Sequence, residues 1–231
     1  MKKYIPNTLT CCNLICGCIA VVWALYGEPL LAFAFIVGGA VFDFFDGMSA
    51  RLLGVSSPIG KELDSLADCV TFGVAPSAMV YTLLNIIEFP ASLGVVGKYL
   101  PFVAFVMAAF SALRLAKFNL DERQTTSFIG LPTPANALFW ASLINGFKLE
   151  NLGGYALPVI LALLLLCSWI LVSEVPMFAL KFKHWGFKGN EIKYIFLITC
   201  IPLLIFFGLG AFAIIIVWYV ILSIYNWKCK G

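Results

Sequence analysis

Four aspartates lie in two closely spaced pairs in the first third of the chain. Asp43 and Asp46 are three residues apart, and Asp64 and Asp68 are four residues apart. Either spacing places two side chains on the same face of a helix. Two facing pairs of carboxylates would repel each other strongly unless a cation neutralises them. Oxygen ligands of this kind suit hard divalent ions such as Mg²⁺, Mn²⁺ or Ca²⁺. The four aspartates therefore predict a site for divalent metal ions.

The residues around the aspartates are small or suited to phosphate. Gly47, Ala50 and Gly60 leave room for a ligand, and glycine permits a close approach of the backbone. Arg51 carries a guanidinium whose geometry matches a phosphate group. A divalent ion, an arginine and space for a ligand together indicate phosphoryl-group chemistry. Structural ion pairs of the aspartates with Arg51 or Lys61 are an alternative interpretation, but four acids outnumber two bases.

The spacing of these residues forms a longer pattern. Residues 43–68 read D-x-x-D-G-x-x-A-R, eight further residues, and G-x-x-x-D-x-x-x-D. The pattern resembles the signature of the CDP-alcohol phosphotransferases, which are integral membrane enzymes of phospholipid synthesis, and no fixed position departs from it. The resemblance implies that the four aspartates hold one or two divalent ions, and that Asp68 is the general base for the acceptor alcohol. It also implies a set of residues that bind the nucleotide of the CDP-lipid: Gly47, Ala50, Arg51 and Gly60.

Three other stretches resemble the membrane-integral phosphatidylserine synthases within this family. They are residues 5–17, residues 114–119 (RLAKFN, with Lys117 in place of an arginine) and residues 128–134 (FIGLPTP). This resemblance implies that L-serine is the acceptor and that CMP leaves from CDP-diacylglycerol or an ether-lipid analogue. It also implies a homodimer, which is usual in the family.

Within these stretches, three polar residues are candidates for substrate binding. Arg114 is predicted to bind the carboxylate of serine through its guanidinium fork; alternatively, it anchors its helix at the membrane interface. Asn119 orients the amino group of serine or caps the helix. Asn13 contacts the nucleotide, or it holds two helices together within the membrane.

The composition shows which elements must position these residues. The chain is 62% hydrophobic and 12% charged, whereas soluble domains average about 45–50% apolar and about 25% charged residues. This composition excludes a soluble enzyme, a disordered protein and a nucleic-acid binder. A helix of roughly 20 apolar residues crosses a bilayer. The segments that fit this length are residues 8–27, 29–53, 63–88, 99–118, 132–148, 155–180, 191–208 and 210–227.

The distribution of basic residues tests this assignment. With eight spans, both termini and three of the loops lie on one side of the membrane. Thirteen of the fifteen Lys and Arg residues fall on that side, and only Lys98 and Lys148 fall on the other. Because cytoplasmic loops carry an excess of Lys and Arg, both termini and the aspartate segment are expected to face the cytoplasm. We therefore predict an all-α integral membrane protein of about eight transmembrane helices, forming a single domain over residues 1–231.

Two further functions compete with serine transfer. A related transferase would use inositol phosphate or glycerol phosphate as the acceptor, and Arg114, Lys117 and Arg123 do not exclude a phosphorylated acceptor. A transporter of divalent cations would also place carboxylates in the membrane, but such sites usually lie near the midplane. Lys181, at the predicted end of the sixth span, is a further candidate for contact with a substrate phosphate.

Overall fold

In the computed structural model, the described residues are 4–55, 57–90, 93–121, 128–180, 186 and 190–230, and they are almost entirely helical. The α-helices are α1 (Tyr4–Leu25), α2 (Pro29–Leu53), α3 (Pro58–Asp68), α4 (Ala75–Ile86), α5 (Gly94–Tyr99), α6 (Val106–Leu120), α7 (Thr133–Gly146), α8 (Ala156–Val172), α9 (Glu191–Phe207) and α10 (Ala211–Lys230). The other elements are the π-helix η1 (Cys69–Val74), the 3₁₀-helices η3 (Leu100–Phe105), η4 (Leu149–Tyr155) and η5 (Gly208–Gly210), and the strands β1 (Phe128–Ile129) and β2 (Pro176–Met177). The predicted all-α class is confirmed.

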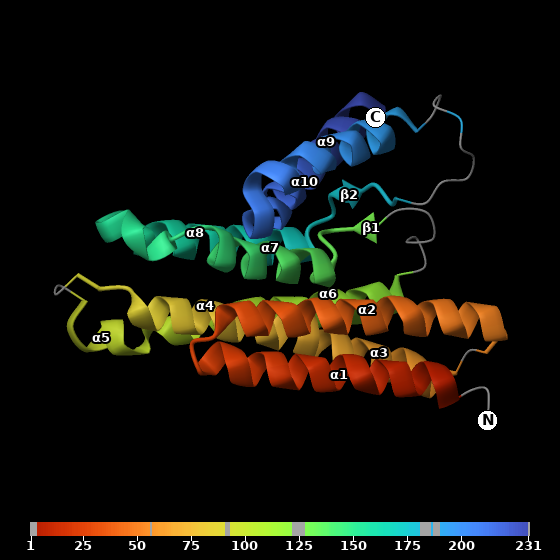
Figure 1. Cartoon of the computed structure of the whole chain (residues 1–231), viewed down its shortest axis with the longest axis horizontal. Coiled ribbons are helices and arrows are strands. Elements are labelled where there is room, and N and C mark those ends of the chain that lie inside the picture. The colour runs from red at the N-terminus through yellow and green to blue at the C-terminus, as the bar shows by residue number, and fades with distance from the viewer. Residues whose placement is uncertain are drawn as a thin grey trace.

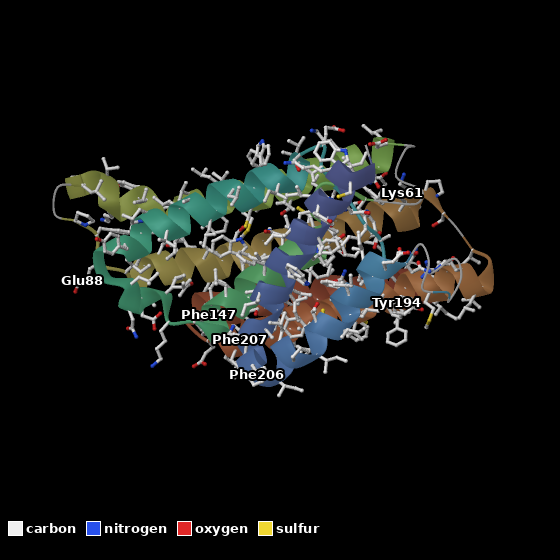
Figure 2. All side chains as sticks on the ribbon, turned by 90° about the horizontal axis from the view of Figure 1, so that it is seen from above. Lys61, Glu88, Phe147, Tyr194, Phe206 and Phe207 are labelled. Atoms are coloured by element: carbon white, nitrogen blue, oxygen red, sulfur yellow. The ribbon has the colours of Figure 1, made fainter. Side chains whose placement is uncertain are left out.

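The long helices run side by side, and the two ends of the molecule differ. In Figure 1, α1, α2, α3–α4 and α6 form one layer, α7 and α8 lie against it, and the α9–α10 hairpin crosses above α7. The start of α1, the end of α2 and the start of α3 lie at the same end of this layer. Figure 2 shows Lys61, in the first turn of α3, and Glu88, just beyond α4, at opposite ends of the long axis. The predicted metal-binding segment thus joins two helices near one end of the protein.

The chain is an integral membrane protein with six candidate membrane-spanning runs among the described residues. Each run is helical, at least 18 residues long and strongly apolar. The last of them, Glu191–Cys229, is interrupted by η5 and comprises α9 and α10, which pack against each other. Helix α7 has only 14 residues, about 21 Å at 1.5 Å per residue, which is less than the thickness of a hydrocarbon core. The prediction of eight spans is therefore not confirmed by length and composition.

The third helical run begins earlier than the sequence predicts. Helix α2 ends at Gly54, which adopts a left-handed conformation (φ 62°) that glycine tolerates at a helix end. Helix α3 begins at Pro58 instead of residue 63, and the Ser57 side chain caps it by accepting a hydrogen bond from the backbone N–H of Gly60 (3.0 Å). Proline at the first helical position and serine at the cap are both favourable. The connection between α2 and α3 is therefore shorter than expected.

The helix in the sixth predicted span, residues 155–180, ends earlier than the sequence predicts. Helix α8 stops at Val172 instead of residue 180, and Ser173 is extended. Pro176 lacks a backbone N–H and restricts the residue before it, so the helix cannot continue through this segment. The chain instead forms β2, which pairs antiparallel with β1.

A serine in α7 anchors the α9–α10 hairpin. The Ser142 hydroxyl donates a hydrogen bond to the carbonyl of Leu209 (2.5 Å) and accepts one from the backbone N–H of Ala213 (2.9 Å). Gly146, one turn further along α7, touches the backbone of Gly210 and has no room for a Cβ atom. The turn of the hairpin is therefore fixed directly on α7.

Candidate active site

Three of the four predicted aspartates meet at one point between α2 and α3. Asp43, Asp64 and Asp68 each offer a carboxylate oxygen, and these oxygens lie within 4.8 Å of one another. One oxygen of Asp64 is buried and accepts no hydrogen bond in the described part of the chain. Three carboxylates this close, one of them with an unpartnered oxygen, fit a divalent cation that takes oxygen ligands. The donor set therefore matches the predicted metal site.

Asp46 lies beside this cluster and not within it. A spacing of three residues places Asp46 on the same face of α2 as Asp43, but about 4.5 Å further along the helix axis. Its side chain is buried, and its Oδ2 accepts a hydrogen bond from the Thr10 hydroxyl (2.5 Å). Asp46 also lines a cavity next to the cluster. The structure therefore places three aspartates together and the fourth at the boundary between the cluster and the cavity.

The cavity next to the cluster has a volume of about 260 Å³ and is bounded by α1, α2 and α3. Both Asp46 and Asp64 contribute to its wall, as do the three small residues predicted to make room for a nucleotide: Gly47, Ala50 and Gly60. A Cβ atom at Gly47 would point into open space. Glycine at position 47 therefore leaves open a part of the cavity that a larger side chain would fill.

Six residues of the cavity wall are not among the site residues predicted from the sequence: Pro6, Asn7, Thr10, Val55, Ser57 and Lys61. A Cβ atom at Gly60 would lie 3.0 Å from the Ser57 Oγ and 3.1 Å from the Asn7 Oδ1, so glycine allows these elements to approach closely. Lys61 contributes a positive charge beside Asp64, and its Nζ donates to the backbone carbonyl of Asn119 (2.9 Å). Lys61 directly follows Gly60, which belongs to the sequence pattern, and this position could have indicated a place in the cavity wall. The sequence alone instead favours a role of Lys61 in setting the membrane orientation or in a structural ion pair.

Two residues predicted to bind the nucleotide lie outside this cavity wall. Arg51 is exposed in the last turn of α2 and is not among the residues that line the cavity. Asn13 is completely buried in α1, where its Nδ2 donates to Asp68 Oδ1 (3.2 Å). Asn13 therefore contacts a carboxylate of the cluster, and its side chain does not face the cavity.

The two candidate serine-binding residues of α6 have different surroundings. Arg114 is buried, its guanidinium lies 5.0 Å from the centre of the Phe118 ring, and its Nε has no hydrogen-bond partner in the described residues. Asp68 lies within electrostatic range of Arg114. The Asn119 side chain, in contrast, donates to the Ser65 hydroxyl (2.8 Å) and ties the end of α6 to α3.

A second, small cavity adjoins Arg114. Its volume is about 30 Å³, and its walls come from α6, β1, the end of α8 and the segment after it. Lys117, Ser173 and Glu174 line it together with Arg114. Arg123 and Lys181, which were also candidates for phosphate contact, lie outside the described residues.

Comparison with known proteins identifies the family. A model of the CDP-alcohol phosphatidyltransferase family matches residues 3–172. The chain belongs to this family. The match confirms the resemblance and includes the aspartates, their cavity and Arg114, whereas β2, α9 and α10 lie beyond it.

Several curated proteins are similar to most of the chain. A CDP-diacylglycerol–serine O-phosphatidyltransferase of Bacillus subtilis is 37% identical over 82% of this chain and 95% of its own length. Proteins of the same name from Helicobacter pylori (30% identical, 96% of this chain, 90% of its own length) and Methanocaldococcus jannaschii (31%, 92% and 88%) are also similar. These two similarities extend over more of the chain than the family match does.

Proposed function

We propose that this protein is a metal-dependent CDP-diacylglycerol–serine O-phosphatidyltransferase. The observation that carries the proposal is the cluster of Asp43, Asp64 and Asp68 beside a cavity with Lys61 in its wall, in a chain similar to enzymes of that name. The serine hydroxyl attacks the lipid-bearing phosphorus of the CDP-lipid. A new P–O bond to serine forms, the P–O bond to CMP breaks, and phosphatidylserine and CMP are the products.

The aspartates and Lys61 have separate tasks in this reaction. Asp43, Asp46, Asp64 and Asp68 would hold one or two divalent ions, Mg²⁺, Mn²⁺ or Ca²⁺, which when bound neutralise the charge of the pyrophosphate. Asp68 takes the proton of the serine hydroxyl. Gly47, Ala50 and Gly60 give space to the cytidine nucleotide. Lys61 faces its phosphates from the cavity wall, and Arg51 remains the predicted phosphate contact at the end of α2.

The acceptor binds on the side of Arg114. The buried guanidinium has an unpartnered Nε and lies within electrostatic range of Asp68. Those features suit a residue that pairs with the serine carboxylate and holds the hydroxyl near the base. Since the Asn119 amide is engaged with Ser65, we assign it a supporting role at the end of α6.

The orientation in the membrane follows from the basic residues. We propose eight spans in one domain of residues 1–231, with α7 as a short span and α9 and α10 as two spans joined at Gly208–Gly210. This arrangement places both termini and the aspartate site on the cytoplasmic side, where the excess of Lys and Arg lies. We also propose that the protein is a homodimer, as is usual in the family.

An acceptor-specificity assay tests the function. Purified protein in detergent micelles receives CDP-diacylglycerol, Mn²⁺ or Mg²⁺, and one of L-serine, inositol phosphate or glycerol phosphate, and CMP release is measured. We expect CMP release with L-serine and its loss when EDTA removes the metal. Release with another alcohol alone would make the protein a related transferase. Metal-ion flux in vesicles without CMP release would point to transport.

A further inference from the structure

Helix α1 donates hydrogen bonds to two of the four aspartates, although it carries none of them. The Thr10 hydroxyl donates to Asp46 Oδ2 (2.5 Å), and the Asn13 amide donates to Asp68 Oδ1 (3.2 Å). Thr10 is 3% exposed and Asn13 is 0% exposed, so water has little access to either bond. Thus α1 contacts one aspartate of α2 and one of α3.

Close packing holds α1 in the position that these bonds require. The Thr71 hydroxyl of η1 donates to the backbone carbonyl of Asn13 (3.0 Å). A Cβ atom at Gly39 of α2 would lie 2.5 Å from the Thr71 Cγ2 and 2.8 Å from the Asn13 Oδ1, and Gly17 of α1 has no room for a Cβ atom beside Thr71. Because the three elements are in direct contact, the donors on α1 cannot easily shift away from the carboxylates.

Each bond engages one oxygen of its carboxylate, Oδ2 of Asp46 and Oδ1 of Asp68. A carboxylate that ligates a metal is normally oriented by such outer hydrogen bonds, and their loss typically lowers metal affinity or activity 10–100-fold. The Thr10 hydroxyl has a single proton, which can go to Asp46 Oδ2 or to the backbone carbonyl of Pro6 (3.0 Å). The shorter distance and the charge of the carboxylate favour Asp46.

We propose that Thr10 and Asn13 are positioning residues of the aspartate site. Thr10 orients the carboxylate of Asp46 and Asn13 orients that of Asp68 for their roles toward the metal ions and the reacting groups. The inference rests on the proposed function of the aspartates as metal ligands. It gives Thr10 a role that the motif does not include, and it replaces the predicted nucleotide contact of Asn13 with a contact to the base.

The first test compares two threonines of α1. Thr10→Val removes the hydroxyl with little change of shape, and Thr10→Ser retains it. Thr8→Val is the matched control, because among the described residues the Thr8 hydroxyl donates to a backbone carbonyl one turn earlier, that of Tyr4, and to no carboxylate. Mn²⁺ binding to the purified protein, without substrates, is followed by the electron paramagnetic resonance signal of free Mn²⁺.

We expect the Kd for Mn²⁺ to rise about 10-fold or more in Thr10→Val, and to stay near that of the native protein in Thr10→Ser and Thr8→Val. Unchanged Mn²⁺ binding in Thr10→Val would overturn the role of Thr10. An equal loss in Thr8→Val would also overturn it, because the effect would then belong to the helix as a whole.

The second test separates the two roles of Asn13. If Asn13 positions the base, Asn13→Leu lowers kcat about 10-fold or more and leaves the KM for CDP-diacylglycerol close to its native value. A raised KM with unchanged kcat would make Asn13 a nucleotide contact and overturn the inference. Asn13→Ala, assayed in the same way, gives the answer if the leucine variant does not fold.

Asp64→Asn distinguishes a failure of this inference from a failure of the proposed metal site. If Asp64→Asn binds Mn²⁺ as the native protein does, the metal site itself is wrong. If Asp64→Asn loses Mn²⁺ while Thr10→Val retains it, the metal site stands and only the role of Thr10 is wrong.

Discussion

Two of the cavities among the described residues, the one beside the aspartate cluster (the aspartate cavity) and the one beside Arg114 (the Arg114 cavity), are built in different ways. The aspartate cavity lies between α1, α2 and α3, and its carboxylates come from one continuous segment, residues 43–68. The Arg114 cavity combines the end of α6, β1 and the segment after α8. Helix α1 donates hydrogen bonds to Asp46 in the wall of the first cavity and to Asp68 in the adjoining cluster, whereas the Arg114 Nε at the second has no hydrogen-bond partner among the described residues.

This difference is in line with the proposal that the first cavity binds the CDP-lipid and the second binds serine. A donor site that holds metal and pyrophosphate needs several fixed charges, and a compact helix hairpin supplies them at set spacing. An acceptor site for a small amino acid needs one well-placed cation with free hydrogen-bonding capacity. The hairpin of α9 and α10, beyond the family match, packs against β2 through α10, and β2 pairs with β1, which contributes to the wall of the Arg114 cavity. We therefore expect variants near the two cavities to affect different substrates.

The largest effect is expected at Asp68, the proposed general base. Asp68→Asn removes the proton acceptor while keeping the shape of the side chain, and kcat should fall about 10²–10⁴-fold. Binding of CDP-diacylglycerol, measured by calorimetry, should largely survive. Glu62→Gln, an exposed acid of the same helix, is the control and should retain its turnover. Turnover of Asp68→Asn close to the native rate would show that another group takes the proton.

The next effect is expected at Arg114, the proposed contact of the serine carboxylate. Arg114→Lys retains the charge but loses the planar fork, and it should raise the KM for L-serine about 30-fold, which corresponds to about 2 kcal/mol. The KM for CDP-diacylglycerol should change little, as CMP-release kinetics with each substrate varied in turn would show. Equal losses for both substrates, together with a lower unfolding temperature, would make Arg114 an anchor of α6 instead.

Two lysines, one from each cavity wall, test whether the two cavities bind different substrates. Lys61 lines the aspartate cavity and Lys117 lines the Arg114 cavity. Lys61→Met should raise the KM for CDP-diacylglycerol about 5–10-fold, because a charge-assisted contact to phosphate is worth about 1 kcal/mol or more. Lys117→Met should leave that KM unchanged. If both variants weaken the CDP-lipid equally, the two cavities form one continuous phosphate-binding surface and the comparison fails.

The smallest effect is expected at the hairpin. The Tyr219 hydroxyl donates to the carbonyl of Phe178 (2.8 Å), just after β2. Tyr219→Phe removes this bond, worth about 0.5–1.5 kcal/mol, and should raise the KM for L-serine a few-fold without changing that for CDP-diacylglycerol. Ser223→Ala, which removes a bond within α10 alone, is the control. A serine KM that stays native in Tyr219→Phe would separate the hairpin from the acceptor site.

The sequence by itself determined the class of protein, most helix boundaries and the aspartate segment. Apolar runs long enough to cross a bilayer have few alternatives to helix, because every backbone polar group must be satisfied within the membrane. The spacing of Asp43, Asp46, Asp64 and Asp68 was informative because helical geometry converts separations of three and four residues into shared faces.

Only the tertiary structure decided how side chains distant in sequence are combined. It grouped three aspartates and set Asp46 apart, turned Asn13 toward Asp68 and placed Lys61 in the cavity wall. It also paired Asn119 with Ser65 and ended α8 at Val172. These outcomes depend on how the helices are rotated about their axes and how closely they pack. At Gly17 and Gly39, for example, a Cβ atom would collide with side chains of neighbouring helices. Spacing along one helix carries no information about such contacts.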